Sequence, residues 1–370
     1  MSNSNSVKAK TLAMLNKDEV ASIHTIGNDI GDTYTTYAAV DHEGKIVAEG
    51  RVVTRAKALQ QLYGGLTRVR MVLETGTHSP WMSRLLESMG HEVIVANSRE
   101  LHMIFKSNKK RDQVDARTLA KVGRFDISLL HPVHHRGEEV QRDLTLLRTR
   151  DTVVTVRTRL INTIRGSVKS FGERLPGCTA EAFASKARRF VPEPLRDALD
   201  PLFDTVDKLT EQIRAREKQI AKLIETTYPE ARRAMQIKGV GPLTALAFVL
   251  LIEDGKRFSN SRQVGAYFGL VPALAESGTI QPQKHITKAG DVMMRRLLVN
   301  AAHYILGPFG EDCDLRRHGL AIAERGGKNA KKRAVVAVAR KLAVLLHRLW
   351  VSQLTYEPLY NAKRKLAKVA

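Results

Sequence analysis

The sequence predicts an α/β domain followed by an all-helical region, and three observations support this prediction. Between residues 23 and 96, short alternating apolar segments are separated by turn residues, a pattern that is typical of strands. From about residue 138 the apolar residues recur at helical spacing through many charged positions. The chain has 370 residues and 43% hydrophobic content, which is enough to bury the cores of two or three domains.

Three strands joined by tight turns open the predicted α/β domain, at residues 23–30, 34–40 and 45–54. Predicted helices at 56–63 and 80–89 then alternate with predicted strands at 68–74 and 91–96, and helical segments continue to about residue 123. The resulting order βββ-α-β-α-β-α is that of ribonuclease-H-like (RuvC-like) domains. We therefore expect a mixed sheet with helices on both faces, made partly parallel by its β-α-β crossovers.

Two long helical tracts follow, and glycines and prolines place the connection between them at about 172–194. The second tract has heptad spacing, with Arg216 filling one position of the apolar seam formed by Leu202, Val206, Leu209, Ile213, Ile220 and Leu223. The two tracts predict a helical hairpin or coiled coil, which pairs with its own other arm or with a second protomer.

The predicted organisation has five segments. Residues 1–22 are a flexible arm, 23–135 the ribonuclease-H-like domain, 136–228 the helical coiled coil, 229–352 a compact helical C-terminal domain, and 353–370 a basic tail. In the C-terminal domain a tight turn at 239–241 joins two helices, and long helices are expected at about 291–306 and 331–350.

The net charge points to a polyanionic partner. The chain has 60 Lys and Arg against 38 Asp and Glu, a formal charge of +22, and such an excess commonly neutralises nucleic-acid phosphates. An anionic membrane surface is the competing partner, but no run of 18 apolar residues exists and the first 20 residues contain no apolar signal core. Neither cysteine has metal-ligand spacing, so we expect no disulfide or zinc and a cytoplasmic location. His134 and His135 also lack metal-spaced partners and are expected at the surface.

Four carboxylates form an ordered set within this predicted fold. Asp29 would sit on the first strand and Glu74 at the end of the fourth, and these strands are neighbours in a ribonuclease-H-like sheet. Asp112 and Asp115 are three residues apart, which places both on one face in the first turns of a helix. Asp32 competes with Asp29 for the first position, but Asp29 follows the apolar strand directly, whereas Asp32 lies in the turn.

A convergence of these carboxylates requires cations, because like charges brought close together repel. Oxygen ligands suit Mg²⁺, and two such ions about 4 Å apart could activate an attacking oxygen and stabilise a leaving oxygen at a phosphate. Each carboxylate also has an ordinary interpretation, as a turn residue, a surface group or a helix N-terminal residue favoured by the helix dipole. The ordered set inside the matching strand pattern favours the metal site.

Ser277 is the candidate nucleophile, in a loop before Gly278. A serine hydroxyl needs a base, a metal or a preformed site to attack, and the alternative is a Ser-Gly turn without chemistry. Thr287 is the other nearby hydroxyl. The neighbouring side chains could stabilise a scissile phosphate or could be a solvated charge run; they are Lys284, His285, Lys288 and Arg295.

Two further features could contact a nucleic-acid backbone. Lys238 and the turn containing Gly239 and Gly241 would present a cation and backbone N–H groups to a phosphate at a helix start, although a tight turn between packed helices is the alternative. Residues 321–350 contain eight Lys or Arg and one acidic residue, and the helix there begins with Lys331, Lys332 and Arg333. Aromatic residues make up 5% of the chain, which favours phosphate contacts over binding mainly by base stacking.

These residues and their surroundings resemble a known family. Asp29 in Gly-Asn-Asp-Ile-Gly, Glu74 in Leu-Glu-Thr-Gly, and Asp112 and Asp115 in Lys-Arg-Asp-Gln-Val-Asp-Ala are similar to the acidic motifs of the DEDD insertion-sequence transposases, the IS one-ten group. The segments 237–245, 258–272, 276–278 and 286–298 resemble the C-terminal transposase domain of the same family. The match covers roughly residues 23–350, and two separate motif sets in the right order make it specific.

The resemblance implies an RNA-guided DNA recombinase that cuts and rejoins strands through a covalent serine–DNA intermediate. Family members combine a DEDD domain, a coiled coil and a serine-bearing domain, and an element-encoded structured RNA selects donor and target DNA. Carried over to this chain, Asp29, Glu74, Asp112 and Asp115 would bind Mg²⁺, and Ser277 would form a 5′-phosphoserine link. The resemblance also implies a homo-oligomer, a dimer or tetramer, in which the acidic site of one protomer meets the serine of another, and a cytoplasmic, nucleoid-associated location.

Three other functions are compatible with the sequence. A structure-selective, Holliday-junction-like endonuclease would use metal-bound water and leave Ser277 idle. A non-enzymatic nucleic-acid-binding scaffold would carry the carboxylates as surface residues, and an RNA chaperone would keep its activity in Asp112→Asn. The loop at 277–285 is less glycine-rich and less basic than in the family, which bears on the geometry of the loop rather than on the serine.

Overall fold

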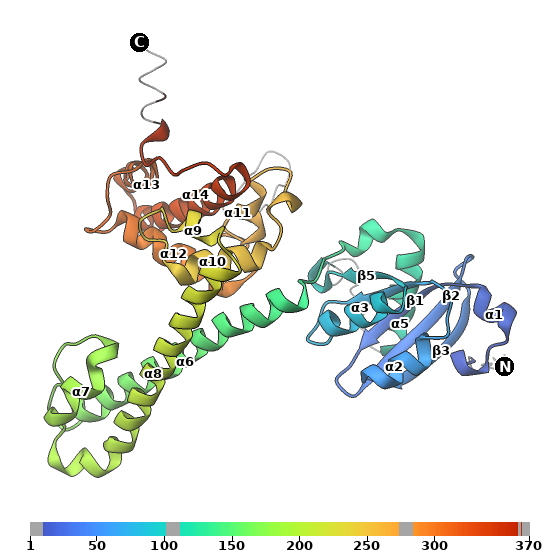
Figure 1. Ribbon diagram of the computed structural model, residues 1–370, viewed down its shortest axis with the longest axis horizontal. Coiled ribbons are helices and arrows are strands. Elements are labelled where there is room, and N and C mark those ends of the chain that lie inside the picture. The colour runs from blue at the N-terminus through green and yellow to red at the C-terminus, as the bar shows by residue number, and fades with distance from the viewer. Residues whose placement is uncertain (1–9, 101–111, 274–283, 362–363, 365–370) are drawn as a thin grey trace. The chain divides into compact units, whose positions relative to one another are not determined.

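The computed structural model describes residues 10–100, 112–273, 284–361 and 364. The chain divides into two compact units, residues 1–137 and 138–370 (Figure 1). The described strands lie in the first unit, and the second unit is helical. Within the described residues, no helix is long and apolar enough to cross a membrane.

A mixed sheet forms the centre of the first unit, and the described strands follow the order β3-β2-β1-β4-β5. They are β1 (Ile23–Ile30), β2 (Tyr34–Asp41), β3 (Ile46–Val53), β4 (Arg70–Glu74) and β5 (Glu92–Ala96). The pairs β1–β2 and β2–β3 are antiparallel, whereas β1–β4 and β4–β5 are parallel. The helices are α2 (Ala56–Tyr63), α3 (Ser79–Ser88) and α5 (Asp112–Phe125), with a 3₁₀ helix at Ile127–Leu130. The predicted mixed sheet is therefore confirmed.

The two faces of the sheet bury different apolar clusters. Met71 and Leu73 of β4 pack in one cluster with Leu59 of α2. Val72 packs in a second cluster with Leu119 of α5. Since successive residues of a strand point to opposite faces, α2 and α3 cover one face of the sheet and α5 covers the other. The prediction of helices on both faces is confirmed.

Residues 10–22 are not the flexible arm that their polar composition predicted. They form a 3₁₀ helix (Leu12–Met14) and α1 (Lys17–Ala21), and the Leu12 side chain is buried. The Leu12 backbone N–H donates to the Tyr37 hydroxyl at 3.2 Å, and the Glu49 N–H donates to the carbonyl of Lys10 at 2.8 Å. The prediction was wrong because a single buried leucine among polar residues leaves no periodic signal.

The second unit consists of a long hairpin and a helical bundle. Its helices are α6 (Glu138–Lys169), α7 (Phe183–Ala187), α8 (Arg196–Thr226), α9 (Ala231–Ala234), α10 (Pro242–Ile252), α11 (Gln263–Tyr267), α12 (Val292–Leu306), α13 (Asp314–Glu324) and α14 (Ala330–Ser352). Its 3₁₀ helices are Ala180–Ala182, Arg188–Phe190, Glu193–Leu195 and Gly255–Arg257. Helices α6 and α8 pack side by side as the two arms of the hairpin. Helix α7 contacts α8 at the end of the hairpin that is farthest from the bundle (Figure 1). In the bundle α10 is the central helix, because every residue from 244 to 252 is buried.

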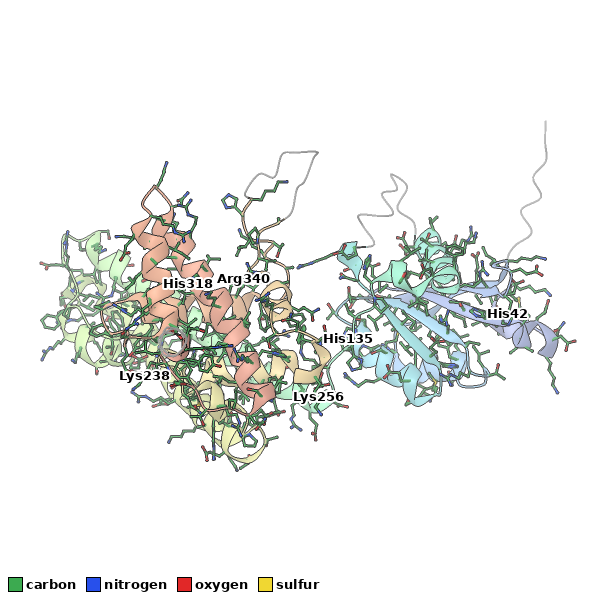
Figure 2. All side chains as sticks on the ribbon, turned by 90° about the horizontal axis from the view of Figure 1, so that it is seen from above. His42, His135, Lys238, Lys256, His318 and Arg340 are labelled. Atoms are coloured by element: carbon green, nitrogen blue, oxygen red, sulfur yellow. The ribbon has the colours of Figure 1, made fainter. Side chains whose placement is uncertain are left out.

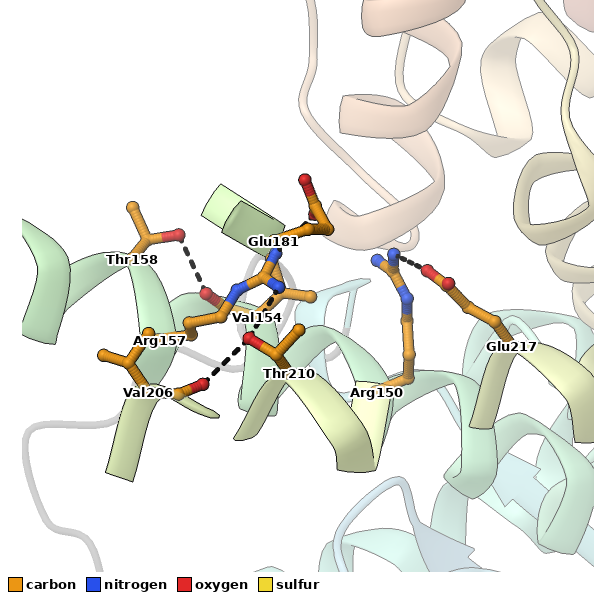
Figure 3. Close-up of polar contacts among 8 residues, drawn as sticks. All are labelled: Arg150, Val154, Arg157, Thr158, Glu181, Val206, Thr210 and Glu217. Atoms are coloured by element: carbon orange, nitrogen blue, oxygen red, sulfur yellow. Dashed lines mark hydrogen bonds and ion pairs between the residues drawn. The ribbon is translucent and has the colours of Figure 1, made fainter. Parts of the chain in front are cut away.

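A buried polar layer crosses the hairpin (Figure 3). Arg157 of α6 is 5% exposed, and its guanidinium donates to Thr210 of α8 at 3.3 Å and to Glu181 at 3.0 Å. The Thr210 hydroxyl donates in turn to the carbonyl of Val206 at 2.8 Å. A guanidinium taken out of water needs such partners, so this layer aligns the two arms.

The buried positions of α8 differ in part from the predicted seam. They are Leu199, Phe203, Val206, Thr210, Ile213, Ile220 and Ile224. Val206, Ile213 and Ile220 were predicted, but the alternate positions lie one residue later than predicted, at Thr210 rather than Leu209, for example. Counting apolar residues missed this shift because Thr210 is polar, and because at 202–203 and 223–224 two adjacent apolar residues fit either register.

Residues 353–361 are not a free basic tail, as the sequence predicted. Arg233 donates to the carbonyl of Gln353 at 2.7 Å, and the Asp314 N–H donates to the carbonyl of Pro358 at 2.8 Å. Tyr356 is partly buried against the bundle core. The segment therefore packs on the bundle, and the Lys- and Arg-rich residues from 362 onward lie outside the described part of the chain, except Arg364.

Candidate functional site

Gly27 allows helix α5 to lie directly on strand β1. A Cβ at position 27 would lie 2.2 Å from the carbonyl oxygen of Ala116, so a larger residue cannot occupy this position without moving the helix. At the other end of α5, Arg70 donates to the carbonyl of Gly123 at 2.9 Å. Because Arg70 pairs with Thr25 near the start of β1, α5 runs antiparallel to β1. Its first turn therefore points toward the C-terminal end of the strand.

Asp29 and Glu74 lie side by side on the face that α5 covers. Asp29 follows Gly27 by two residues and so points to the same face. Glu74 follows Val72 by two residues, and Val72 contacts α5, since a Cβ at Gly123 would lie 2.3 Å from it. The parallel register of β1 and β4 gives Asp29 and Glu74 adjacent positions. Both side chains are partly buried.

Asp112 and Asp115 lie in the first turn of α5. Ala116 contacts Gly27, and Asp115 directly precedes it. Asp112 lies about 6 Å from Ala116 along the helix axis, toward the N-terminus of α5. Asp29 lies about 7 Å beyond Gly27 in the same direction along the strand. The α5 carboxylates and the strand carboxylates therefore reach the same edge of the sheet. Asp112 is exposed and Asp115 is partly buried.

A pocket of about 380 Å³ opens beside Asp29 and Glu74; it is lined by Asp29, Ile30, Asp32, Glu74, Thr75, Gly76, Thr77 and His78. The carboxylate oxygens here are the ligands that Mg²⁺ prefers, so the chemistry of the donor set fits this ion. Within the described residues, however, no group of three or more His, Cys, Asp or Glu side chains is close enough to hold a metal. Binding would require the α5 carboxylates and the strand carboxylates to move together.

Asp32 has a different environment from Asp29. Its carboxylate is 97% exposed and lies 3.1 Å from His78 Nε2. Trp81 Nε1, which can only donate, lies 3.0 Å from His78 Nδ1. The neutral His78 ring therefore carries its proton on Nε2 and donates it to Asp32. Sequence reasoning missed His78, because nothing in a single sequence places a turn residue beside a carboxylate 46 positions away.

Ser79 and His135 hold the turn that follows Glu74. The Ser79 hydroxyl donates to the carbonyl of Gly76 at 2.9 Å and accepts from the Gly76 N–H at 3.0 Å. His135 Nε2 lies 2.8 Å from the same hydroxyl. Burial lowers the pKa of His135, and the charge of Arg84, followed by those of the adjacent basic residues, lowers it further. The prediction that His135 is a surface residue was wrong, since it is half-buried and braces the rim of the pocket.

Ser277 and Gly278 lie outside the described residues. The chain segments on either side of them pair with each other, through an antiparallel bridge between Pro272 and Ile286. The Ala273 N–H donates to the carbonyl of His285 at 2.9 Å. The described residues therefore fix the two ends of the loop that carries the candidate nucleophile.

The predicted phosphate-binding side chains beside this loop fall into two groups. Lys284, His285 and Lys288 are exposed. Arg295 is partly buried, and its Nη1 lies 2.5 Å from the carbonyl of Ala289 and within 3.3 Å of the carbonyls of Phe268 and Gly290. Arg295 therefore holds the turn before α12, in addition to any contact with a phosphate.

The hairpin turn before α10 has the expected shape. Gly239 has a φ of +94°, and a Cβ there would lie 2.9 Å from the Tyr304 ring. Gly241 precedes α10, whose first backbone N–H groups receive no capping bond from the Gly241 position. Lys238 lies 3.5 Å from Glu311 and is 68% exposed. The turn could take a phosphate, but packing against Tyr304 also accounts for its glycine.

The cations at the start of α14 are all exposed, namely Lys331, Lys332 and Arg333. Positive side chains at a helix N-terminus are disfavoured by the helix dipole. A bound anion would remove this disadvantage, because it would interact favourably with both the side chains and the dipole.

The chain matches transposase families in both of its units. A DEDD transposase model of the IS110 type matches residues 26–172, and the model described as "Transposase IS116/IS110/IS902 family" matches residues 231–309. Over 346 residues the chain is 30% identical to the transposase for insertion sequence element IS1111A of Coxiella burnetii, which covers 90% of this chain and 91% of that protein. The chain is an insertion-sequence transposase of the IS110 family.

Other relatives of this transposase carry related names. It is 25% identical over 343 residues to a probable family 20 transposase of Pseudomonas aeruginosa, covering 90% of this chain and 98% of that one. It is also 22% identical over 297 residues to the pilin gene-inverting protein of Moraxella bovis, covering 78% and 81% of the two chains.

The two family matches divide the candidate residues of the transposase between them. The first match contains Asp29, Glu74, Asp112 and Asp115. The second contains Lys238, Ser277 and Arg295 among others, whereas the cations that begin α14 lie beyond it. The acidic site and the candidate nucleophile thus belong to separately matched segments.

Proposed function

We propose that this transposase is an RNA-guided DNA recombinase that cuts strands with Ser277, assisted by Mg²⁺ at Asp29, Glu74, Asp112 and Asp115. The observation that supports it most is the arrangement of Asp29 and Glu74 side by side at one sheet edge, beneath the first turn of α5. Moving the two α5 carboxylates up to this strand pair would require cations to offset their repulsion, which is the charge that metal-assisted phosphate chemistry supplies.

The acidic residues would hold the metal with distinct contributions. Asp29 and Glu74 come from a rigid sheet and would supply fixed oxygens, whereas Asp112 and Asp115 would close in from the helix. When bound, Mg²⁺ would neutralise a DNA phosphate and favour the departure of its leaving oxygen. In this scheme Asp32 does not bind the metal. It keeps its contact with His78 and so helps to position the residues at the rim of the pocket.

The cutting step is a transesterification. Ser277 Oγ attacks a backbone phosphorus, a new O–P bond forms, and the bond from phosphorus to the 3′ oxygen breaks. The serine proton is transferred to the departing 3′ oxygen, which leaves as a hydroxyl. In the second step a 3′ hydroxyl of the exchanged strand attacks the 5′-phosphoserine, and the serine regains its proton. The ester energy is conserved, so strand joining needs no ATP.

The partners follow from the family and the charge. Transposases act on DNA, and we propose that a structured guide RNA selects the element ends and the target. The cations that would contact these backbones are Lys238, Lys284, His285, Lys288, Arg295, Lys331, Lys332 and Arg333, with the N–H groups near Gly239 and Gly241. The proposed organisation is a DEDD domain at 23–135, a coiled coil at 136–228 and a serine-bearing domain at 229–352, in a homodimer or homotetramer.

A metal-dependent endonuclease is the second candidate, because the four carboxylates alone would support hydrolysis. The relative named as a gene-inverting protein favours recombination instead. Inversion of a DNA segment requires rejoining, and a covalent intermediate stores the energy for it.

A covalent-adduct assay tests the proposal. The purified protein with its co-purifying RNA, Mg²⁺ and labelled element-end DNA would be denatured and separated on a gel, beside Ser277→Ala, Asp112→Asn and Thr287→Ala. We expect a DNA-linked protein band that disappears in the first two variants and persists in the third. Cleavage without any band, unchanged in Ser277→Ala, would establish the endonuclease instead.

A further inference from the structure

A large pocket in the helical bundle lies apart from the residues assigned above. Its volume is about 800 Å³, which is within the range of ligand sites. Helices α13 and α14 and the segment 352–361 form its walls, and Arg262 also lines it. Its floor is apolar and includes Leu315, Ala337, Val344, Leu345 and Leu349.

The walls of this pocket are made rigid by backbone hydrogen bonds. The Asp314 N–H donates to the carbonyl of Pro358, and the Asn361 N–H donates to Asp314 Oδ2 at 2.7 Å. The Tyr356 N–H donates to Gln236 Oε1 at 2.8 Å. Residues 353–361 therefore form a fixed wall, and the pocket is formed before any ligand binds.

Four exposed cations line the pocket, together with the carboxylates of Asp314 and Glu357. Arg340 and Lys341 lie eight and seven residues before Arg348 on α14, so each lies close to it on the helix surface. Arg262 also lines the pocket. Within the described residues, no ion pair joins any of these four cations to a carboxylate.

His318 also lines this pocket, and its pKa is affected by the positive charges nearby. His318 and Arg340 are labelled in Figure 2. Burial lowers the pKa of His318, and the charges of Lys341 and Arg325 lower it further. Beyond the last wall residue, the sequence from 362 to 370 adds four more Lys or Arg and no carboxylate. The chain's own C-terminal segment is therefore a poor occupant, because its charge has the same sign as the mouth.

An apolar floor beneath a cationic rim fits a nucleic-acid strand whose bases are unpaired. A duplex would contact the rim with its phosphates but would leave the floor facing water, because its bases are stacked inside. A single strand can turn its bases toward the floor while its phosphates stay at the rim. Tyr360 adds an aromatic surface there, with the Arg348 guanidinium 5.7 Å from its ring centre.

The carboxylate of Asp314 favours RNA over DNA. Asp314 Oδ2 already accepts from the Asn361 N–H. Because a carboxylate can only accept hydrogen bonds, its other oxygen can pair only with a donor on the ligand. RNA carries such a donor on every ribose, the 2′-hydroxyl, and DNA does not.

We propose that this pocket binds an unpaired segment of RNA, with bases on the apolar floor and phosphates on Arg262, Arg340, Lys341 and Arg348. The inference deepens the proposed function and rests on it for the presence of an RNA partner. It names the surface of the bundle that holds a single-stranded part of that RNA.

Fluorescence anisotropy with the full-length protein tests this site. The probe is a labelled single-stranded RNA of about 12 nucleotides, within the site sizes of single-strand-binding grooves, and its competitors are DNA of the same sequence and the RNA duplex. Arg340→Gln with Lys341→Gln should weaken RNA binding roughly tenfold and reduce the slope of log K against log salt by about 1.4, since each phosphate contact contributes about 0.7. The matched control, Lys218→Gln with Lys222→Gln, removes equal charge from the exposed surface of α8 and should change neither quantity.

A second variant tests the floor separately from the charge. Tyr360→Ala should weaken RNA binding about fivefold or more and leave the salt slope unchanged, because it removes a stacking surface and no cation. Unchanged affinity and slope in the double cation variant would overturn the site. Equal binding of DNA and RNA would overturn the assignment to RNA, and preference for the duplex would overturn the role of the floor. The assay contains neither Mg²⁺ nor element-end DNA, so its outcome is independent of the adduct assay.

Discussion

The two units of this transposase hold their candidate residues in different ways. In the first unit the backbone positions them. The register of β1 and β4 places Asp29 beside Glu74, and Gly27 allows α5 to pack closely on β1. In the second unit, exposed side chains such as Lys284 and Lys288 extend from turns. A sheet edge thus fixes positions before any ligand binds, whereas exposed side chains on turns leave more of their geometry to a ligand.

The largest expected effect tests the rigid unit directly. Asp29→Asn should reduce strand transfer on the order of 10²-fold or more, because a neutral amide ligates and neutralises far less than a carboxylate. Asp32→Asn, a matched change at the competing aspartate, should keep activity within a few-fold. Strand transfer on element-end DNA measures both. The reverse order of effects would move the metal site to Asp32.

Gly27→Ala should come next in size. Its Cβ would overlap the carbonyl of Ala116, so α5 must shift, at a cost of about 3 kcal/mol in the free energy of unfolding. Gly65→Ala is the matched control, because nothing lies within 4 Å of a Cβ there. Urea unfolding compares the two. Equal stability of both variants would mean that α5 is not pressed onto β1.

The hairpin gives a smaller effect. Glu181→Ala removes a charged hydrogen-bond partner from the buried Arg157 and should cost about 2 kcal/mol. Glu225→Ala breaks an ion pair with Arg232 that is more than half exposed on both sides and should cost about 1 kcal/mol or less. Thermal unfolding of both variants distinguishes them, and a larger loss in Glu225→Ala would contradict the buried layer.

The smallest effect is a pH dependence of the first unit. Burial lowers the pKa values of His24, His91 and His135, so the unfolded chain binds more protons than the folded one below pH 6.5. Their contribution is fully present above pH 6.5 and is lost as the pH falls below it. We expect His135→Gln to make the unfolding free energy less steep between pH 7 and 5. A slope as steep in His135→Gln as in the unchanged protein would contradict the burial of this ring.

Much of the first unit could be predicted because its signals are local. The helix at 56–63 matches its predicted bounds, and β1 was predicted from its first to its last residue. Period-two alternation bounded by turn residues is visible in a short window. The sheet order that brings Asp29 to Glu74 followed from the element order, whereas the glycine that seats α5 on β1 has no signature in one sequence.

The errors share one physical cause, which is that single contacts outweighed composition. Leu12 anchors a segment that is polar overall, and a few backbone hydrogen bonds hold residues 353–361 on the bundle. Thr210 occupies a seam position that apolar counting gave to Leu209. His135 reaches Ser79 across 56 residues. None of these contacts is periodic, so pattern analysis could not find them.

The buried Arg157 layer also restricts how the length of the hairpin can change. Sliding α6 past α8 by one heptad, about 10 Å, would separate the guanidinium from Thr210 and Glu181 and place a cation among apolar side chains. An insertion in one arm alone would shift the residues beyond it relative to the other arm, and would separate facing residues in the same way. Related chains with longer or shorter hairpins should therefore carry paired insertions or deletions, of equal length, in both arms.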